Sequence, residues 1–151
     1  MSLPVLVSAC LLGRRCRYDG GENRDGELAR RLAAEGLTAV PFCPEEEGGL
    51  PTPRPPAWIE SGDAEAVLDG EARMVTDAGR DVTAPFIAGA RGAAETCRAH
   101  GIRRAILKER SPSCGVACTH VGGERTPGPG VTAALLRREG VEVEGCEGRQ
   151  P

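Results

Sequence analysis

Runs of apolar residues, separated by polar and glycine-rich stretches, indicate where strands lie along this chain. Continuous apolar runs at residues 3–9, 37–42 and 102–107 are typical of strands buried on both faces of a parallel sheet. A shorter run at 141–143 predicts a last strand. Residues 57–75, with turn signals at Gly62 and Gly70, predict short strands that form a small antiparallel excursion.

Helical periodicity fills the intervals between these runs. Leu28 and Leu32 predict a helix over 27–35, a longer apolar face predicts one from Asp81 or Thr83 to His100, and a third covers 131–139. Strands alternating with helices are the signature of a doubly wound sheet. We therefore expect an α/β fold, a single-domain Rossmann-like three-layer sandwich over residues 1–151 with a mostly parallel sheet.

The remaining segments predict ordered loops. Residues 13–26, 109–115 and 122–130 combine glycine with polar residues, whereas 44–56 holds five prolines and two glycines and predicts a rigid, non-regular loop. Twenty-one glycines and 12 prolines in 151 residues agree with a fold rich in such loops.

Composition excludes several classes of function. The net charge is −3 and aromatic residues make up 3% of the chain, which argues against a protein that binds DNA or RNA. No apolar run approaches the roughly 20 residues that cross a bilayer. Residues 7–10 imitate a lipoprotein cleavage site, but the preceding residues lack a charged segment, so we expect a cytoplasmic protein that does not bind membranes.

Seven cysteines are the unusual feature, and an odd number in a reducing compartment indicates metal binding or catalysis. Cys10, Cys43 and Cys114 each follow a predicted strand. Ligands of open parallel sheets bind beyond the carboxyl ends of the strands, so three thiols could meet there. Thiolates suit an iron–sulfur cluster, zinc or copper(I). The alternative is three unrelated buried thiols.

The other cysteines have weaker signals. Cys97 lies on an apolar helix face and predicts a core residue, and Cys146 in the polar tail predicts a solvent-facing thiol without a role. Cys16, six residues after Cys10, is a spare ligand or redox partner. Cys118, near His120, imitates a zinc cluster, although no Cys-x-x-Cys pair occurs.

Several long motifs resemble the DUF523 family, which includes the thiouracil desulfidases, and the resemblance covers nearly the whole chain. The segments that carry it are residues 7–13, 16–21, 43–45, 48–54, 81–83, 107–109, 111–115 and 130–136. It implies a [4Fe-4S] cluster held by Cys10, Cys43 and Cys114, with the fourth iron free to bind the substrate's sulfur. Iron–sulfur assembly machinery is then an expected partner.

The reaction implied by the resemblance is hydrolytic and non-redox: 2-thiouracil plus water gives uracil plus hydrogen sulfide. Glu45 matches the family's catalytic glutamate and Ser111 its catalytic serine. From the residues alone, Glu45 would be one of three solvated acids and Ser111 a turn initiator. Arg54 either orients the substrate or forms a structural ion pair.

Residues 117–123 depart from the aromatic and aspartate-glycine segment that the family shows after its last cysteine, which leaves the choice of thiolated heterocycle open. Two functions other than desulfurisation are also consistent with the sequence. One is a structural zinc protein that uses Cys114, Cys118 and His120, with Cys10 or Cys16. The other is a non-catalytic iron–sulfur sensor that binds a thiolated metabolite or a partner.

Overall fold

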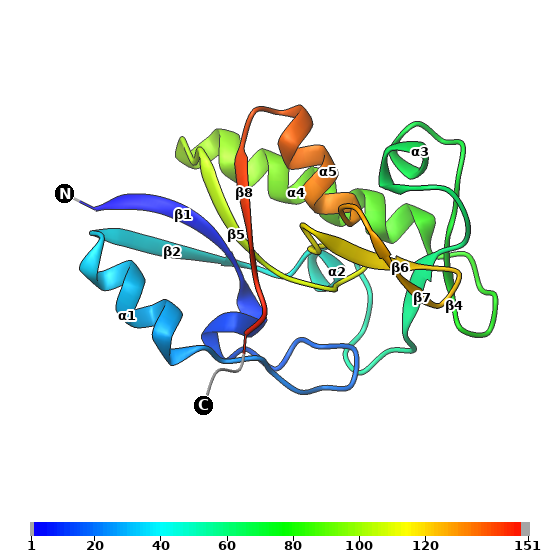
Figure 1. Cartoon of the computed structure of the whole chain (residues 1–151), viewed down its shortest axis with the longest axis horizontal. Helices are drawn as coiled ribbons and strands as arrows, with labels where there is room; N and C mark the ends of the chain where they lie inside the picture. The colour runs from blue at the N-terminus through cyan, green and yellow to red at the C-terminus, as the bar shows by residue number, and fades with distance from the viewer. Residues whose placement is uncertain (1, 149–151) are drawn as a thin grey trace.

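The computed structural model describes residues 2–148, which contain two four-stranded sheets (Figure 1). The first sheet, which has the longer strands, is parallel throughout. Its strand order is β2 (Leu37–Phe42), β1 (Leu3–Ser8), β5 (Arg104–Lys108) and β8 (Glu142–Cys146). The predicted α/β fold with a mostly parallel sheet is confirmed.

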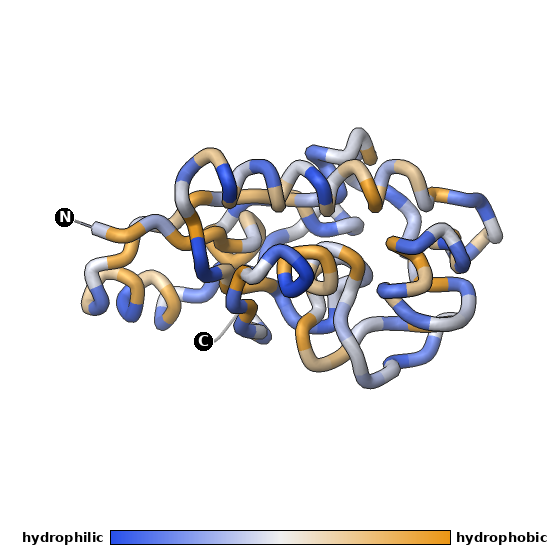
Figure 2. The backbone as a smooth tube through the Cα atoms, turned by 90° about the horizontal axis from the view of Figure 1, so that it is seen from above, coloured by the Kyte–Doolittle hydropathy of each residue, from blue (hydrophilic) through white to orange (hydrophobic). Residues whose placement is uncertain are grey.

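Helices cover both faces of this sheet, as Figure 1 shows. Helix α1 (Gly26–Ala34) packs on one face, where Leu28 and Leu32 join the alternate β1 residues Val5 and Val7 in one apolar cluster. Helices α4 (Thr83–His100) and α5 (Val131–Arg138) cover the other face, where Leu6 packs with residues of both helices. Figure 2 shows apolar and polar positions alternating along the helix turns, because one side of each helix faces the sheet.

The second sheet has the order β4 (Met74–Thr76), β3 (Ala57–Ile59), β6 (Cys118–Val121) and β7 (Glu124–Pro127). Strands β3 and β4 form the expected antiparallel pair within residues 57–75. A helix, α3 (Ala64–Leu68), stands between them and was not predicted; its N-terminus is capped by Asp63, whose carboxylate accepts a 2.8 Å hydrogen bond from the Ala66 amide.

Strands β6 and β7 form a hairpin that was not predicted: residues 118–121 were assigned to no element, and 122–130 was expected to be a loop. Gly122 and Gly123 occupy the turn with φ of 59° and 83°, a left-handed conformation that favours glycine and is typical of tight hairpins. The prediction that 122–130 is non-regular is therefore wrong for residues 124–127. The short length and polar composition of β7 hide it from the hydrophobic pattern.

The remaining short elements follow the strands of the parallel sheet. A 3-10 helix, η1 (Ala9–Leu12), follows β1, and α2 (Pro44–Glu47) follows β2, so the prediction of a wholly non-regular segment over 44–56 is wrong for its first turn. Proline at the first helical position needs no amide donor and has the φ of a helix.

Two cysteines, Cys97 and Cys146, pack within the fold, the first in α4 and the second in β8. Cys97 is buried in α4, as predicted. Cys146 is not solvent-facing: it is half-buried in β8, and its thiol donates a 3.4 Å hydrogen bond to the carboxylate of Asp25. Across residues 2–148, none of the helices combines the length and the apolar character that crossing a membrane requires.

Candidate active site

A cavity of about 640 Å³ lies between the carboxyl ends of the parallel sheet and the second sheet. Its walls come from the segments after β1, β2 and β5, from the proline-rich segment 49–56, and from β3, β4 and β6. This is the position at which open α/β sheets bind ligands.

The three cysteines that follow strands all line this cavity. Cys10 lies in η1 directly after β1, Cys43 immediately precedes α2 at the end of β2, and Cys114 lies in the segment after β5. Strand β1 pairs with both β2 and β5, and Ser8 is in register with Phe42, so the three segments start side by side. All three thiols are buried. The structure thus places on the wall of one cavity the three cysteines that the sequence singled out, with their Sγ atoms not all within 4.8 Å of one another.

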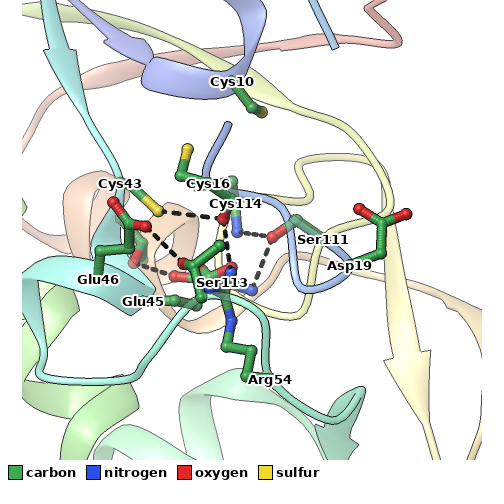
Figure 3. Close-up of polar contacts among 12 residues, drawn as sticks. Cys10, Cys16, Asp19, Cys43, Glu45, Glu46, Arg54, Ser111, Ser113 and Cys114 are labelled. Carbon is green, nitrogen blue, oxygen red and sulfur yellow. Dashed lines mark hydrogen bonds and ion pairs between the residues drawn. The ribbon is translucent and has the colours of Figure 1, made fainter. Parts of the chain in front are cut away.

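Cys16 is the fourth buried cysteine of the cavity wall, only 2% exposed. Figure 3 shows the thiols of Cys10, Cys16 and Cys43 following one another along one side of the site. The Sγ atoms of Cys16 and Cys43 and a carboxylate oxygen of Glu46 lie within 4.8 Å of one another. The Cys43 thiol donates to the Cys16 carbonyl at 3.8 Å. Cys16, expected to be a spare ligand or a redox partner, therefore lies with the other thiols of the cavity.

Contacts among the thiols and burial shift their pKa values in different directions. A hydrogen bond with Cys16, reinforced by one from the Asn23 amide at 3.6 Å, lowers the pKa of Cys10 to about 7. Hydrogen bonding to Cys16 also lowers the pKa of Cys43. Burial, with the nearby charge of Glu45, raises the pKa of Cys114 well above its usual range. Thiolate character is thus concentrated at Cys10 and Cys43.

Glu45 and Arg54 form a buried ion pair beside the cysteines. The Arg54 Nη2 atom is 3.1 Å from Glu45 Oε2, and the two side chains are only 6% and 12% exposed. The same Nη2 atom donates to the Cys16 carbonyl at 2.9 Å. Burial raises the pKa of Glu45, while the Arg54 charge opposes that rise. Glu45 is therefore not a solvated acid. Arg54 forms an ion pair, which is one of the two roles expected for it from the sequence.

Ser111 organises the segment that carries Cys114. Its Oγ accepts hydrogen bonds from the amides of Ser113 at 3.1 Å and of Cys114 at 3.0 Å, as Figure 3 shows. Just before it, the buried carboxylate of Glu109 accepts the amides of Val116, Ala117 and Cys118. Ser111 lines the cavity as well as holding the turn.

The zinc ligands considered in the sequence analysis are not brought together. Among residues 2–148, Cys16, Cys43 and Glu46 are the one set of three candidate ligand atoms within 4.8 Å of one another, so Cys114, Cys118 and His120 make no such group. The His120 ring instead contacts the Arg110 carbonyl through Nδ1 at 3.1 Å.

All four aromatic residues of the chain line the cavity, a feature that sequence reasoning missed. They are Tyr18, Phe42, Trp58 and Phe86. The low aromatic content argues against nucleic-acid binding, but the sequence does not show that these few rings lie on the wall of one cavity. Aromatic walls suit a flat, unsaturated ligand.

Helix α2, which positions Glu45, lies against α4 at very short range because glycines stand at the contact, Gly89 within α4 and Gly48 directly after α2. A Cβ atom on Gly89 would lie 2.0 Å from the Pro44 carbonyl oxygen, and one on Gly48 would lie 2.0 Å from the Pro85 carbonyl oxygen. The backbone of one helix therefore sets the place of the other, and with it the place of Cys43 and Glu45.

We expect Gly89→Ala to lower the free energy of unfolding by about 1–3 kcal/mol, as overpacking does. Gly92→Ala in the same helix is the control, because its Cβ would meet only the end of the Phe42 ring, at 3.2 Å. Urea unfolding of the two variants checks the prediction. Equal stability of the two would show that α2 is not held by this close approach.

Comparisons with known proteins found a family, a curated relative and a solved structure to which this chain is similar. Residues 5–147 match the model of a family described as 2-thiouracil desulfurase. A Bacillus subtilis (strain 168) protein described as uncharacterized protein YbbK is 44% identical over 142 residues, which is 92% of this chain and 93% of that protein. A solved structure of the [4Fe-4S]-dependent thiouracil desulfidase TudS superimposes with a TM-score of 0.81 at 46% identity, covering 95% of this chain and 91% of that one.

Proposed function

The chain belongs to the 2-thiouracil desulfurase family, and from this premise we propose that it removes sulfur from a thiolated nucleobase, converting 2-thiouracil to uracil and hydrogen sulfide. One observation carries the proposal: buried thiols from three neighbouring strand ends share a cavity with a buried Glu45–Arg54 pair and every aromatic ring of the chain. Exchanging C=S for C=O consumes one water and releases one hydrogen sulfide, with no net oxidation or reduction.

The donor set of the cavity fits an iron–sulfur cluster. Cys10, Cys43 and Cys114 offer three soft, buried sulfur ligands, and a solved structure similar to this chain is described as [4Fe-4S]-dependent. A cluster with three protein ligands supplies an open iron, a soft Lewis acid that suits a thione sulfur. We propose these three residues as its ligands, and iron–sulfur assembly machinery as the partner that loads it.

The protein's own groups then bind the base and move protons. The aromatic walls bind the planar ring. The Glu45 carboxylate, oriented by Arg54, takes a proton from the attacking water as general base. Arg54 acts by fixing Glu45 through their ion pair. Ser111 holds the Cys114 amide with its Oγ and presents that hydroxyl to the cavity, where it relays a proton or orients the substrate.

Trp58 offers a test of the aromatic wall. We expect Trp58→Ala to raise KM for 2-thiouracil about tenfold with little change in kcat, because stacking of a base on an aromatic ring contributes about 1–3 kcal/mol. Trp58→Phe keeps a ring and should stay near the original KM. Steady-state sulfide release measures both variants, and an unchanged KM in Trp58→Ala would mean that this ring does not bind the base.

The proposed function is tested by following sulfide and uracil formation during stepwise anaerobic cluster reconstitution. We expect the rate to rise in proportion to the iron bound and to be absent from the cluster-free chain. A fully loaded chain that binds 2-thiouracil but releases no sulfide would contradict the proposal and favour a non-catalytic sensor.

A further inference from the structure

A second ligand set overlaps the cysteines of the proposed cluster without coinciding with them. Cys16 Sγ, Cys43 Sγ and a Glu46 carboxylate oxygen all lie within 4.8 Å of one another. The thiols of Cys10 and Cys43 are both hydrogen-bonding neighbours of the Cys16 thiol. In a tetrahedral site with metal–sulfur bonds of about 2.3 Å, two sulfur atoms lie about 3.8 Å apart, so a small contraction would suffice.

The Glu46 carboxylate is held from outside this group. Arg14 Nη2 lies 3.2 Å from Oε1, and the Thr52 hydroxyl donates to Oε2 at 2.5 Å. Arg54 donates in turn to Thr52 Oγ1 at 3.0 Å. Carboxylates that bind metals are commonly oriented by such outer hydrogen bonds, which fix their direction before the ion arrives.

We propose that the cluster-free chain binds a single thiophilic divalent cation, such as Zn²⁺, through Cys16, Cys43 and Glu46, with Cys10 as the fourth ligand. Three thiolates and one carboxylate form a tetrahedral set of the sulfur and oxygen donors that zinc binds. Binding breaks the S–H bonds of the ligand thiols and releases their protons to solvent, with no change of oxidation state.

This cation site is separate from the proposed function, and it requires a different set of cysteines from the cluster. The cation and the cluster share Cys10 and Cys43, so they exclude each other. Only the cation requires Cys16, and only the cluster requires Cys114. Zinc binding would therefore occupy the site of a chain that has not received its cluster.

The experiment measures Zn²⁺ affinity of the reduced, cluster-free, full-length chain by competition with a chromophoric chelator under anaerobic conditions. We expect one tight site. Cys16→Ala should weaken it by more than about 100-fold, because even outer partners of a metal site contribute about 10- to 100-fold. Cys114→Ala and the control Cys97→Ala, a buried cysteine outside the cavity, should leave the affinity unchanged.

Cluster reconstitution of the same variants gives the opposite pattern and separates the two proposals. Cys16→Ala should still incorporate iron, whereas Cys114→Ala should not. Cys16→Ser, which keeps the size of the side chain, replaces the alanine variant if that one fails to fold. The inference is overturned if the unaltered chain binds no Zn²⁺, if Cys16→Ala binds it as tightly, or if Cys114→Ala weakens it as much as Cys16→Ala does.

Discussion

We expect replacement of Cys10, Cys43 or Cys114 by alanine to reduce both the iron content of the reconstituted chain and its sulfide release to background. Each residue would contribute one of the three thiolates of the proposed cluster, and Cys114 is the one cysteine between β5 and β6. The truncation removes one buried sulfur, so we expect a loss of about 1 kcal/mol in stability, too little to unfold the chain. Iron analysis and sulfide assays on the same samples measure the effect.

Cys97→Ala and Cys118→Ala are the matched controls for these three variants. Cys97 is buried in α4, and Cys118 lies in β6, outside the cavity wall. Both should incorporate iron and release sulfide like the unaltered chain. A Cys114 variant that kept its iron and its activity would show that the assigned ligand set is wrong.

Glu45→Gln separates proton transfer from cluster binding. We expect this variant to keep its iron while kcat falls about 100- to 10,000-fold, the usual contribution of a general base. Glutamine has the size of glutamate and can still accept the Arg54 hydrogen bond, but it cannot take a proton from water. Loss of one charge of a buried pair also destabilises the chain, by about 3–5 kcal/mol where one partner is removed outright. Circular dichroism and iron content must therefore accompany the kinetics.

Glu47→Gln is the control for the glutamate, since Glu47 belongs to the same acidic run but is exposed and does not line the cavity. It should leave kcat unchanged. If Glu45→Gln retained full kcat with a loaded cluster, another group would have to act as the base, and the role assigned to Glu45 would be withdrawn.

The hydrophobic pattern predicted the parallel sheet well because all its strands carry apolar runs and its central strands, β1 and β5, are buried on both faces. The four apolar runs became β1, β2, β5 and β8, and their parallel order explains why Cys10, Cys43 and Cys114 meet. Cys10 and Cys43 follow their strands closely, so the topology of the sheet decides their place, whereas Cys114 also depends on the turn that Ser111 holds.

The second sheet could not be predicted in the same way. Its strands have three or four residues each, and β7 is polar, so periodicity has too few positions on which to act. Helices α2 and α3 are also short, with four and five residues. They depend on local features: Pro44 begins α2, and Asp63 caps α3. The fold of these segments follows from tertiary contacts.

The chemistry of the site was predictable only in part for a related reason. Glu45 stands in a run of three acids, and nothing local distinguishes the buried one from its neighbours. Its environment is set by Arg54, nine positions away. Likewise, the place of Cys16 among the thiols and the gathering of all four aromatic rings depend on how segments distant in the sequence fold around one cavity.

The most direct test of the account is to incubate the anaerobically loaded chain with 2-thiouracil in ¹⁸O-labelled water and no reductant. We expect equal amounts of sulfide and uracil, with one ¹⁸O atom in each uracil, because the oxygen that replaces sulfur comes from water. Sulfide release that required a reductant, or uracil without the label, would contradict a hydrolytic, redox-neutral desulfidase.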